Sequence, residues 1–129
     1  MKFVIKTMDR AIELKQMTYA FLKKHGVEDK DIDLFVSKEK DVDYYNFMFP
    51  DCNIIKGPMG IVPIDNFIVD YYPEGEKYIY LNDDIKRLYY APDKKSLRVI
   101  DDFMPLVEET FKMMEDQDIT YAGLNPVDN

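Results

Sequence analysis

The chain has few of the side chains that build disulfides, zinc sites and nucleophilic triads. Its single cysteine, Cys52, excludes an internal disulfide, as is usual in cytoplasm-like surroundings. Its single histidine, His25, excludes a His-rich zinc site and argues against a Ser-His triad. We expect Cys52 to be a buried spacer thiol rather than a nucleophile, and His25 to be a cation at a helix C-terminus.

Positive charge is also scarce, since 17 Lys and Arg residues face 25 Asp and Glu residues, for a net charge of -8. This balance opposes nonspecific binding to DNA or to an anionic membrane, which needs a basic face. No apolar run reaches the length of a membrane span, and charge appears too early for a signal peptide. We therefore expect one cytoplasmic domain over residues 1–129, with 47% hydrophobic residues to form its core.

Strand and helix patterns alternate along the first part of the chain. Short apolar runs predict strands at 3–5, 33–37, 53–56 and 77–81. Helical spacing predicts helices at 11–24, through 42–49 and at 64–72. Such alternation is typical of βαβ units, so we predict a Rossmann-like α/β fold with a mostly parallel sheet flanked by helices. Further on we expect a hairpin of strands 88–91 and 96–100 around a turn at 92–95, a helix from 101 to 114, and a strand at 119–122.

The most informative stretch is the last strand of the expected sheet, which runs directly into Asn82-Asp83-Asp84. Acids at the carboxyl end of a parallel strand lie where open α/β sheets bind ligands. Adjacent carboxylates suit Mg²⁺ or Mn²⁺, particularly when phosphates of a substrate complete the coordination shell. The alternative is a solvated acidic turn, because Asn and Asp are favoured turn residues.

Two neighbouring features are compatible with a phosphate ligand. The loop from Gly57 to Gly60 precedes a helix and can present backbone N–H groups to phosphate, although Gly-x-x-Gly alone is a weak signal and favours a plain turn. Lys86 and Arg87 follow the acids closely enough to face a diphosphate, or they form a solvated basic pair.

In its motifs the chain resembles nucleotide-sugar glycosyltransferases of the GT-A type, closest to a viral and phage-like group allied to the TET-associated glycosyltransferases. In that group an opening strand ends in Pro-Ser-Tyr-x-Arg, and a later segment reads Gly-x-x-Gly-Ile-Gly-x-x-Arg-Asn-Phe-Ile before a strand ending in three aspartates. The corresponding places here read Lys6-Thr7-Met8-Asp9-Arg10, then Gly57 through Asp65-Asn66-Phe67-Ile68, then Leu81-Asn82-Asp83-Asp84. The order and spacing fit across nearly the whole chain.

The resemblance implies a donor site for a nucleotide-diphosphate sugar. Thr7 and Arg10 would border the base and ribose, and Asn82 would lie at the ribose. Asp84 would hold Mn²⁺ or Mg²⁺, with Asp83 beside it. The remaining positions implied at this site are Gly60 and Asn66. The acceptor would be a glycan, a protein or a modified nucleic acid, and a viral member would act in the host cytoplasm or the virion.

The chain departs from the pattern in ways that support a second hypothesis. Met8 replaces an aromatic residue, Asn82 replaces an acid, and Asp65 replaces an arginine near the diphosphate, where Lys56, Lys86 or Arg87 would have to substitute. Little sequence follows the acidic motif, so the chain is either a shortened form or lacks an acceptor half, and a partner is then expected.

These departures favour a non-catalytic structural or interaction module on a degraded transferase fold, for example an assembly component of a virus. A nucleotidyltransferase is a third option, disfavoured by the lack of a basic groove. The sequence identifies no general base; Asp101 and Asp102 are candidates only because they open a helix downstream, and their pattern favours acids that stabilise a helix start.

Overall fold

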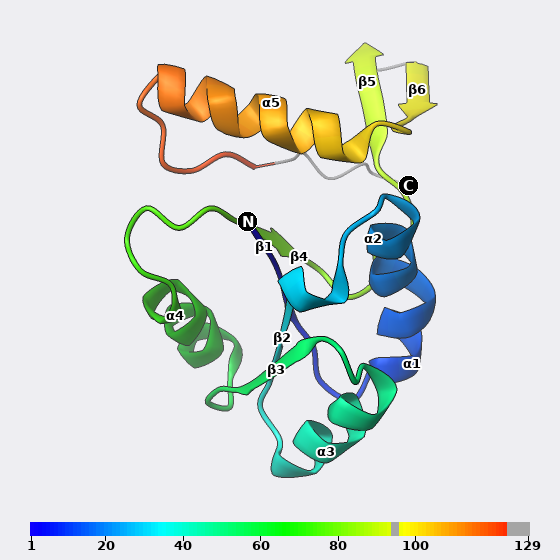
Figure 1. Cartoon of the computed structure of the whole chain (residues 1–129), viewed down its shortest axis with the longest axis vertical. Coiled ribbons are helices and arrows are strands. Elements are labelled where there is room, and N and C mark those ends of the chain that lie inside the picture. The colour runs from blue at the N-terminus through cyan, green and yellow to red at the C-terminus, as the bar shows by residue number, and fades with distance from the viewer. Residues whose placement is uncertain (94–95, 124–129) are drawn as a thin grey trace.

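Four parallel strands form the centre of the structure (Figure 1). The computed structural model describes residues 1–93 and 96–123. The strands are β1 (Lys2–Lys6), β2 (Ile32–Val36), β3 (Asn53–Lys56) and β4 (Tyr78–Leu81), in the order β3-β2-β1-β4. Phe3 of β1 lies opposite Ile32 of β2 and Ile79 of β4. The predicted Rossmann-like α/β fold and its parallel sheet are therefore confirmed.

Helices cover both faces of this sheet (Figure 1). On one face lie α1 (Ala11–Leu14), the π-helical turn η1 (Lys15–Tyr19), α2 (Ala20–Lys24) and α3 (Glu39–Met48). On the other face lies α4 (Ile61–Tyr71). A short 3-10 turn, η2 (Asp29–Asp31), leads into β2. The predicted helix at 11–24 is present, although its middle turn is π-helical.

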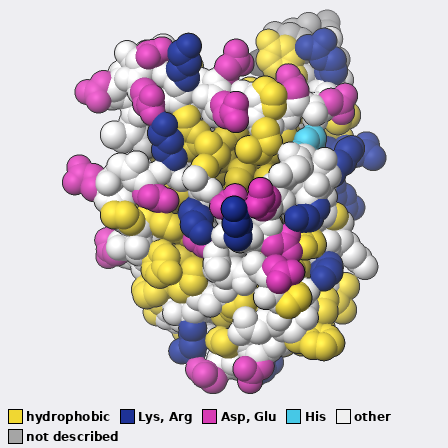
Figure 2. Space-filling model, in the orientation of Figure 1, with side chains coloured by type: hydrophobic (Ala, Val, Ile, Leu, Met, Phe, Trp, Pro, Cys, Tyr) yellow, Lys and Arg dark blue, Asp and Glu magenta, His cyan; other side chains and the backbone are white. Residues whose placement is uncertain are grey.

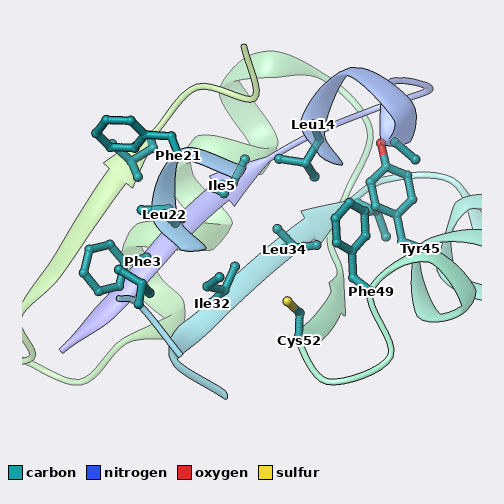
Figure 3. Packing of buried hydrophobic residues seen from close by; sticks show 14 of the residues in the cluster. Phe3, Ile5, Leu14, Phe21, Leu22, Ile32, Leu34, Tyr45, Phe49 and Cys52 are labelled. Atoms are coloured by element: carbon teal, nitrogen blue, oxygen red, sulfur yellow. The ribbon is translucent and has the colours of Figure 1, made fainter. Parts of the chain in front are cut away.

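The core follows from the alternation of side chains along the central strands. On β1, Phe3 and Ile5 point to the α1–α3 face, whereas Val4 packs with Ile64 of α4. Every residue of β2 is buried, as expected for a central parallel strand covered on both sides. Figure 3 shows the larger cluster, in which Leu34 of β2 lies among side chains from α1, α2 and α3.

Helix α4 begins three residues earlier than the predicted start at 64. Gly60 has a φ of 102°, a conformation that favours glycine, and its carbonyl accepts the first helical hydrogen bond from Ile64. Pro63 then occupies the first turn, where its missing N–H costs no hydrogen bond.

The last part of the described chain lies beyond one end of the sheet (Figure 1). Strands β5 (Tyr89–Asp93) and β6 (Ser96–Val99) form the predicted antiparallel hairpin. Residues 94–95 of the expected turn lie outside the described residues. The chain continues into α5 (Phe103–Asp116), whose Phe103 packs edge-on against Phe21 with 5.0 Å between ring centroids. None of the helices in the described ranges is long and apolar enough to cross a membrane.

The predicted strand at 119–122 is wrong, since residues 119–123 form no strand. The N–H of Ile119 donates instead to the carbonyl of Met114, at 2.8 Å, and so closes the end of α5. Tyr121 is 84% exposed, so its side chain has no apolar surface to pack on. The apolar pattern predicted a strand, but a strand also needs an unpaired edge within reach.

The core predicts a clear stability difference between two truncations. Leu34 is 1% exposed, so Leu34→Ala should lower the free energy of unfolding by about 2–5 kcal/mol through lost burial and a residual cavity. Phe47 is 78% exposed, so Phe47→Ala should change the free energy of unfolding by only ~0.5 kcal/mol. Urea unfolding followed by circular dichroism measures both values, and equal effects would contradict this core assignment.

Candidate functional site

The candidate site lies where β1 and β4 end side by side. In the order β3-β2-β1-β4 the chain builds outward from β1 in both directions, so the β1–β4 boundary is the topological switch point of the sheet. Ile5 pairs with Leu81 at the end of this ladder. Thr7 and Asn82 therefore begin neighbouring loops at the same edge, which is the usual ligand-binding edge of an open α/β sheet.

Four of the predicted site residues meet at this edge, namely Thr7, Arg10, Asp83 and Asp84, and we call them the switch-point cluster. The Thr7 hydroxyl donates to Asp83 Oδ2 at 3.1 Å. Arg10 Nε lies 3.3 Å from the same oxygen, and Arg10 Nη2 lies 3.9 Å from Asp84 Oδ2. The side chain of Asp83 is 14% exposed and that of Asp84 is 54% exposed. One carboxylate is thus held by the protein, and the other faces solvent.

Tyr45 of α3 positions the loop after β1. Its buried hydroxyl lies 2.8 Å from Thr7 Oγ1 and accepts a hydrogen bond from the Arg10 N–H at 3.2 Å. Because the Thr7 proton is directed to Asp83, the Tyr45 proton must point to Thr7. Burial raises the pKa of Tyr45, which keeps this proton in place. The result is a directed series of hydrogen bonds from Arg10 through Tyr45 and Thr7 to Asp83.

Thr18 holds the acidic loop after β4. Its buried hydroxyl donates to the Asn82 carbonyl at 2.6 Å and accepts from the Ile85 N–H at 2.8 Å. These two hydrogen bonds engage the residues immediately before Asp83 and immediately after Asp84, and so they fix the backbone of the acidic loop. Thr18 lies in the π-helical turn η1, an irregularity that often occurs at functional sites.

The other predicted site residues lie apart from this cluster. The side chain of Asn82 is exposed, so only its backbone is tied into the site. Asn66 is exposed on α4, and Gly60 precedes that helix. Within the described ranges, no hydrogen bond or ion pair links Asn66 or Gly60 to the cluster.

Asp65 is neutralised by a residue that the sequence analysis did not consider. Lys6, at the end of β1, donates to Asp65 Oδ1 at 2.8 Å, and the Tyr80 hydroxyl donates to the same oxygen at 2.9 Å. The hydrogen bond from Lys6 lowers the pKa of Asp65, so this acid is ionised and paired. A cation therefore lies beside Asp65, although on β1 rather than on α4. Lys56, one of the cations suggested as a substitute for the missing arginine, is paired elsewhere, since its Nζ lies 3.8 Å from Glu39 Oε2.

Lys86 and Arg87 are exposed in the connection between β4 and β5. No ion pair engages either of them in the described part of the chain. Figure 2 shows acidic and basic side chains intermingled on the displayed face, without a broad basic patch.

A hollow of about 340 Å³ lies beside the cluster, on the same loop after β1. Its lining residues come from that loop, α1 and α3, and are Asp9, Ala11, Ile12, Glu13, Lys40, Asp41 and Tyr44. Asp9 has a φ of 55°, and its N–H donates to the buried Asp41 carboxylate at 3.4 Å. The hydrogen bond from Lys38 lowers the pKa of Asp9. Met8, where the resemblance expects an aromatic residue, is 47% exposed.

Compared with protein-family models, with curated proteins and with solved structures, the chain finds no match.

Cys52, His25 and Asp102, which the sequence also singled out, lie outside the switch-point cluster in surroundings typical of structural residues. Burial raises the pKa of the Cys52 thiol to about 12, which removes it as a nucleophile at neutral pH, as predicted. His25 packs its ring against Phe21 and Phe103, with ring centroids 4.6 and 5.6 Å away. Asp102 is the N-cap residue of α5, in line with an acid at a helix start.

Tyr45 and Thr18 are site residues that the sequence did not predict. Tyr45 lies at an apolar position of its predicted helix. That spacing correctly predicts that its ring is buried but gives no information about the partner of its hydroxyl. Thr18 carried a weak signal, because a threonine beside Met17 in a packed helix is a polar group that needs a partner once it is buried.

Thr18 predicts a local effect that can be separated from general destabilisation. Thr18→Val keeps the shape but leaves the Asn82 carbonyl and the Ile85 N–H unpaired, so the free energy of unfolding should fall by about 1–3 kcal/mol. Amide exchange at Ile85 should accelerate in this variant. Thr18→Ser keeps the hydroxyl and should preserve the protection of Ile85. Unchanged protection in Thr18→Val would show that the hydroxyl does not hold this loop.

Proposed function

We propose that the chain binds a nucleotide-diphosphate sugar through the switch-point cluster and acts as the donor half of a metal-dependent glycosyltransferase of the GT-A type. The observation that carries the proposal is the meeting of Thr7, Arg10, Asp83 and Asp84 at the carboxyl edge of adjacent parallel strands. These four residues occupy the positions that the motif resemblance assigns to the donor. They come from two loops that are more than seventy residues apart in the sequence.

The carboxylates of the cluster suit Mn²⁺ or Mg²⁺ when phosphate oxygens share the coordination. In the described part of the chain, no group of three or more His, Cys, Asp or Glu side chains forms a metal cage. The cluster offers two carboxylates, Asp83 and Asp84. One or two protein carboxylates are typical for a cation that is bound together with substrate phosphates. When bound, the cation would offset the charge that develops on the departing nucleoside diphosphate.

The protein's own groups divide the remaining work. Thr7 and Tyr45 hold Asp83 in a fixed orientation, while Asp84 stays free to turn toward a ligand. The resemblance places Arg10 at the base and ribose, but its contacts with Asp83 and Asp84 put its planar guanidinium beside the proposed cation site, where it suits two oxygens of a diphosphate. The base and ribose would lie against the hollow beside Asp9, where the partly exposed ring of Tyr44 offers a surface for stacking, a role that Met8 does not fill. The acceptor, whether glycan, protein or modified nucleic acid, is left open by these features.

The decisive experiment is a thermal-shift and calorimetric titration with UDP-sugars in the presence of Mn²⁺. We expect metal-dependent stabilisation of the native protein, since a ligand that binds only the folded state raises its stability. Asp84→Asn should abolish this stabilisation. Asp70→Asn is the matched control, because Asp70 is an exposed acid of α4 outside the cluster, and it should respond like the native protein.

A second candidate, the non-catalytic interaction module, is favoured by large apolar side chains left in solvent. Phe47 is 78% exposed, and Ile61 and Val62 at the start of α4 are 72% and 67% exposed. Exposed apolar surface of this kind often marks contacts between proteins. In the same titration, the absence of any response to nucleotides or Mn²⁺, with no effect of Asp84→Asn, would favour this module over the transferase.

A further inference from the structure

Arg10 occupies the position of a counter-ion to both acids of the switch-point cluster. Its Nε lies 3.3 Å from Asp83 Oδ2 and its Nη2 lies 3.9 Å from Asp84 Oδ2. In the described ranges, no other cationic side chain is ion-paired with either acid. Lys6, the basic residue at the end of the same strand, is engaged by Asp65. The charge of the two carboxylates is therefore offset by one guanidinium, which leaves the three groups with a net charge of -1.

The Arg10 side chain is free to leave this position without disturbing the fold. Its backbone is held separately, through the bond from its N–H to Tyr45. Its side chain is 45% exposed and makes no other ion pair among the described residues. Asp83 in turn keeps its hydrogen bond from Thr7 whether or not the guanidinium stays. The ion pair between Arg10 and the acids is thus the adjustable part of the cluster.

A divalent cation and the Arg10 guanidinium compete for the same carboxylate oxygens. Both are positive, and Asp83 Oδ2 already contacts Thr7 and Arg10, so cation binding alone requires Arg10 to move away or to stay at an unfavourable distance. A diphosphate changes this balance because it offers Arg10 a pair of anionic oxygens that match the guanidinium fork. Transfer of Arg10 to the diphosphate would release Asp83 and Asp84.

We infer that Arg10 is the switch that makes nucleotide and divalent-cation binding cooperative at this site. Without nucleotide, Arg10 neutralises Asp83 and Asp84 and weakens cation binding. With nucleotide, Arg10 bonds the diphosphate and leaves both acids to the cation. By linkage, the cation must strengthen nucleotide binding by the same factor. This inference rests on the proposed function and adds the order in which the site fills.

Calorimetry on the native chain tests the inference with four titrations. Mn²⁺ is titrated with and without saturating UDP, and UDP with and without Mn²⁺, after subtraction of the Mn²⁺–UDP association measured without protein. In the native protein we expect UDP to tighten Mn²⁺ binding by about tenfold or more.

In Arg10→Gln, Mn²⁺ alone should bind about fivefold tighter than in the native protein, while the tightening by UDP shrinks, although direct contact between cation and diphosphate keeps part of it. Arg10→Lys keeps the charge and should leave Mn²⁺ binding alone as weak as in the native protein. Arg98→Gln is the matched control, since it removes the same charge from the exposed strand β6, where Arg98 lies over the Tyr90 ring, and it should change neither quantity.

The outcomes separate the two levels of the proposal. Two outcomes overturn the switch and leave the proposed function standing. In the first, nucleotide and Mn²⁺ bind with the same coupling factor in the native protein and in Arg10→Gln. In the second, Mn²⁺ alone binds no tighter to Arg10→Gln than to the native protein. Absence of nucleotide binding by the native protein overturns the proposed function, and the transfer of Arg10 with it. Tighter Mn²⁺ binding in Arg10→Gln together with a reduced coupling factor supports both.

Discussion

The hydrogen bond from the Thr7 hydroxyl to the Asp83 carboxylate joins the carboxyl ends of β1 and β4, and the geometry of the candidate site depends on it. It is possible because the two strands are parallel neighbours, so their following loops start at the same edge. Tyr45 orients the Thr7 proton and Thr18 fixes the backbone around Asp83. Removal of any of these contacts would leave a buried polar group unpaired, which costs more than the bond itself contributes.

The two acids of the cluster differ in exposure, and the difference suits a binding site. Asp83 is held by Thr7 and Arg10 and is mostly shielded, whereas Asp84 is more than half exposed. A fixed carboxylate lowers the ordering cost of binding a ligand, and a free one can adjust to it.

Charge pairing at the carboxyl end of β1 and in the loop after it would allow a chain of net charge -8 to present the proposed site for an anionic ligand. Asp65 is paired with Lys6, and Asp9 is paired with Lys38 and lies 3.6 Å from Lys40. These pairs reduce the repulsion that the acids on neighbouring loops would exert on a diphosphate. The surface as a whole stays acidic, which sets this edge apart from the broad basic faces of proteins that hold nucleic acid nonspecifically.

The sequence by itself determined the four strands of the sheet, the helices between them and the position of the acids at a strand end. These features depend on local patterns, such as the apolar run before Asn82, that need no knowledge of distant residues. The resemblance in motif order predicted Thr7, Arg10, Asp83 and Asp84 in one site, and these four meet, but it also predicted Gly60 and Asn66 there, which lie apart. The strand expected at 119–122 failed because its apolar pattern carries no information about whether a free sheet edge lies nearby.

Only the tertiary structure decided which groups hold the site residues. The partners of Asp83, Asp65 and the acidic loop are Thr7, Lys6 and Thr18, and each pair is separated by more than fifty residues. Nothing in the local sequence of Tyr45 or Thr18 indicates that its hydroxyl points to the sheet edge. A side-chain hydrogen bond forms only when the donor–acceptor distance is correct to within a few tenths of an ångström. That positioning arises only after the strands and helices have packed around a common core.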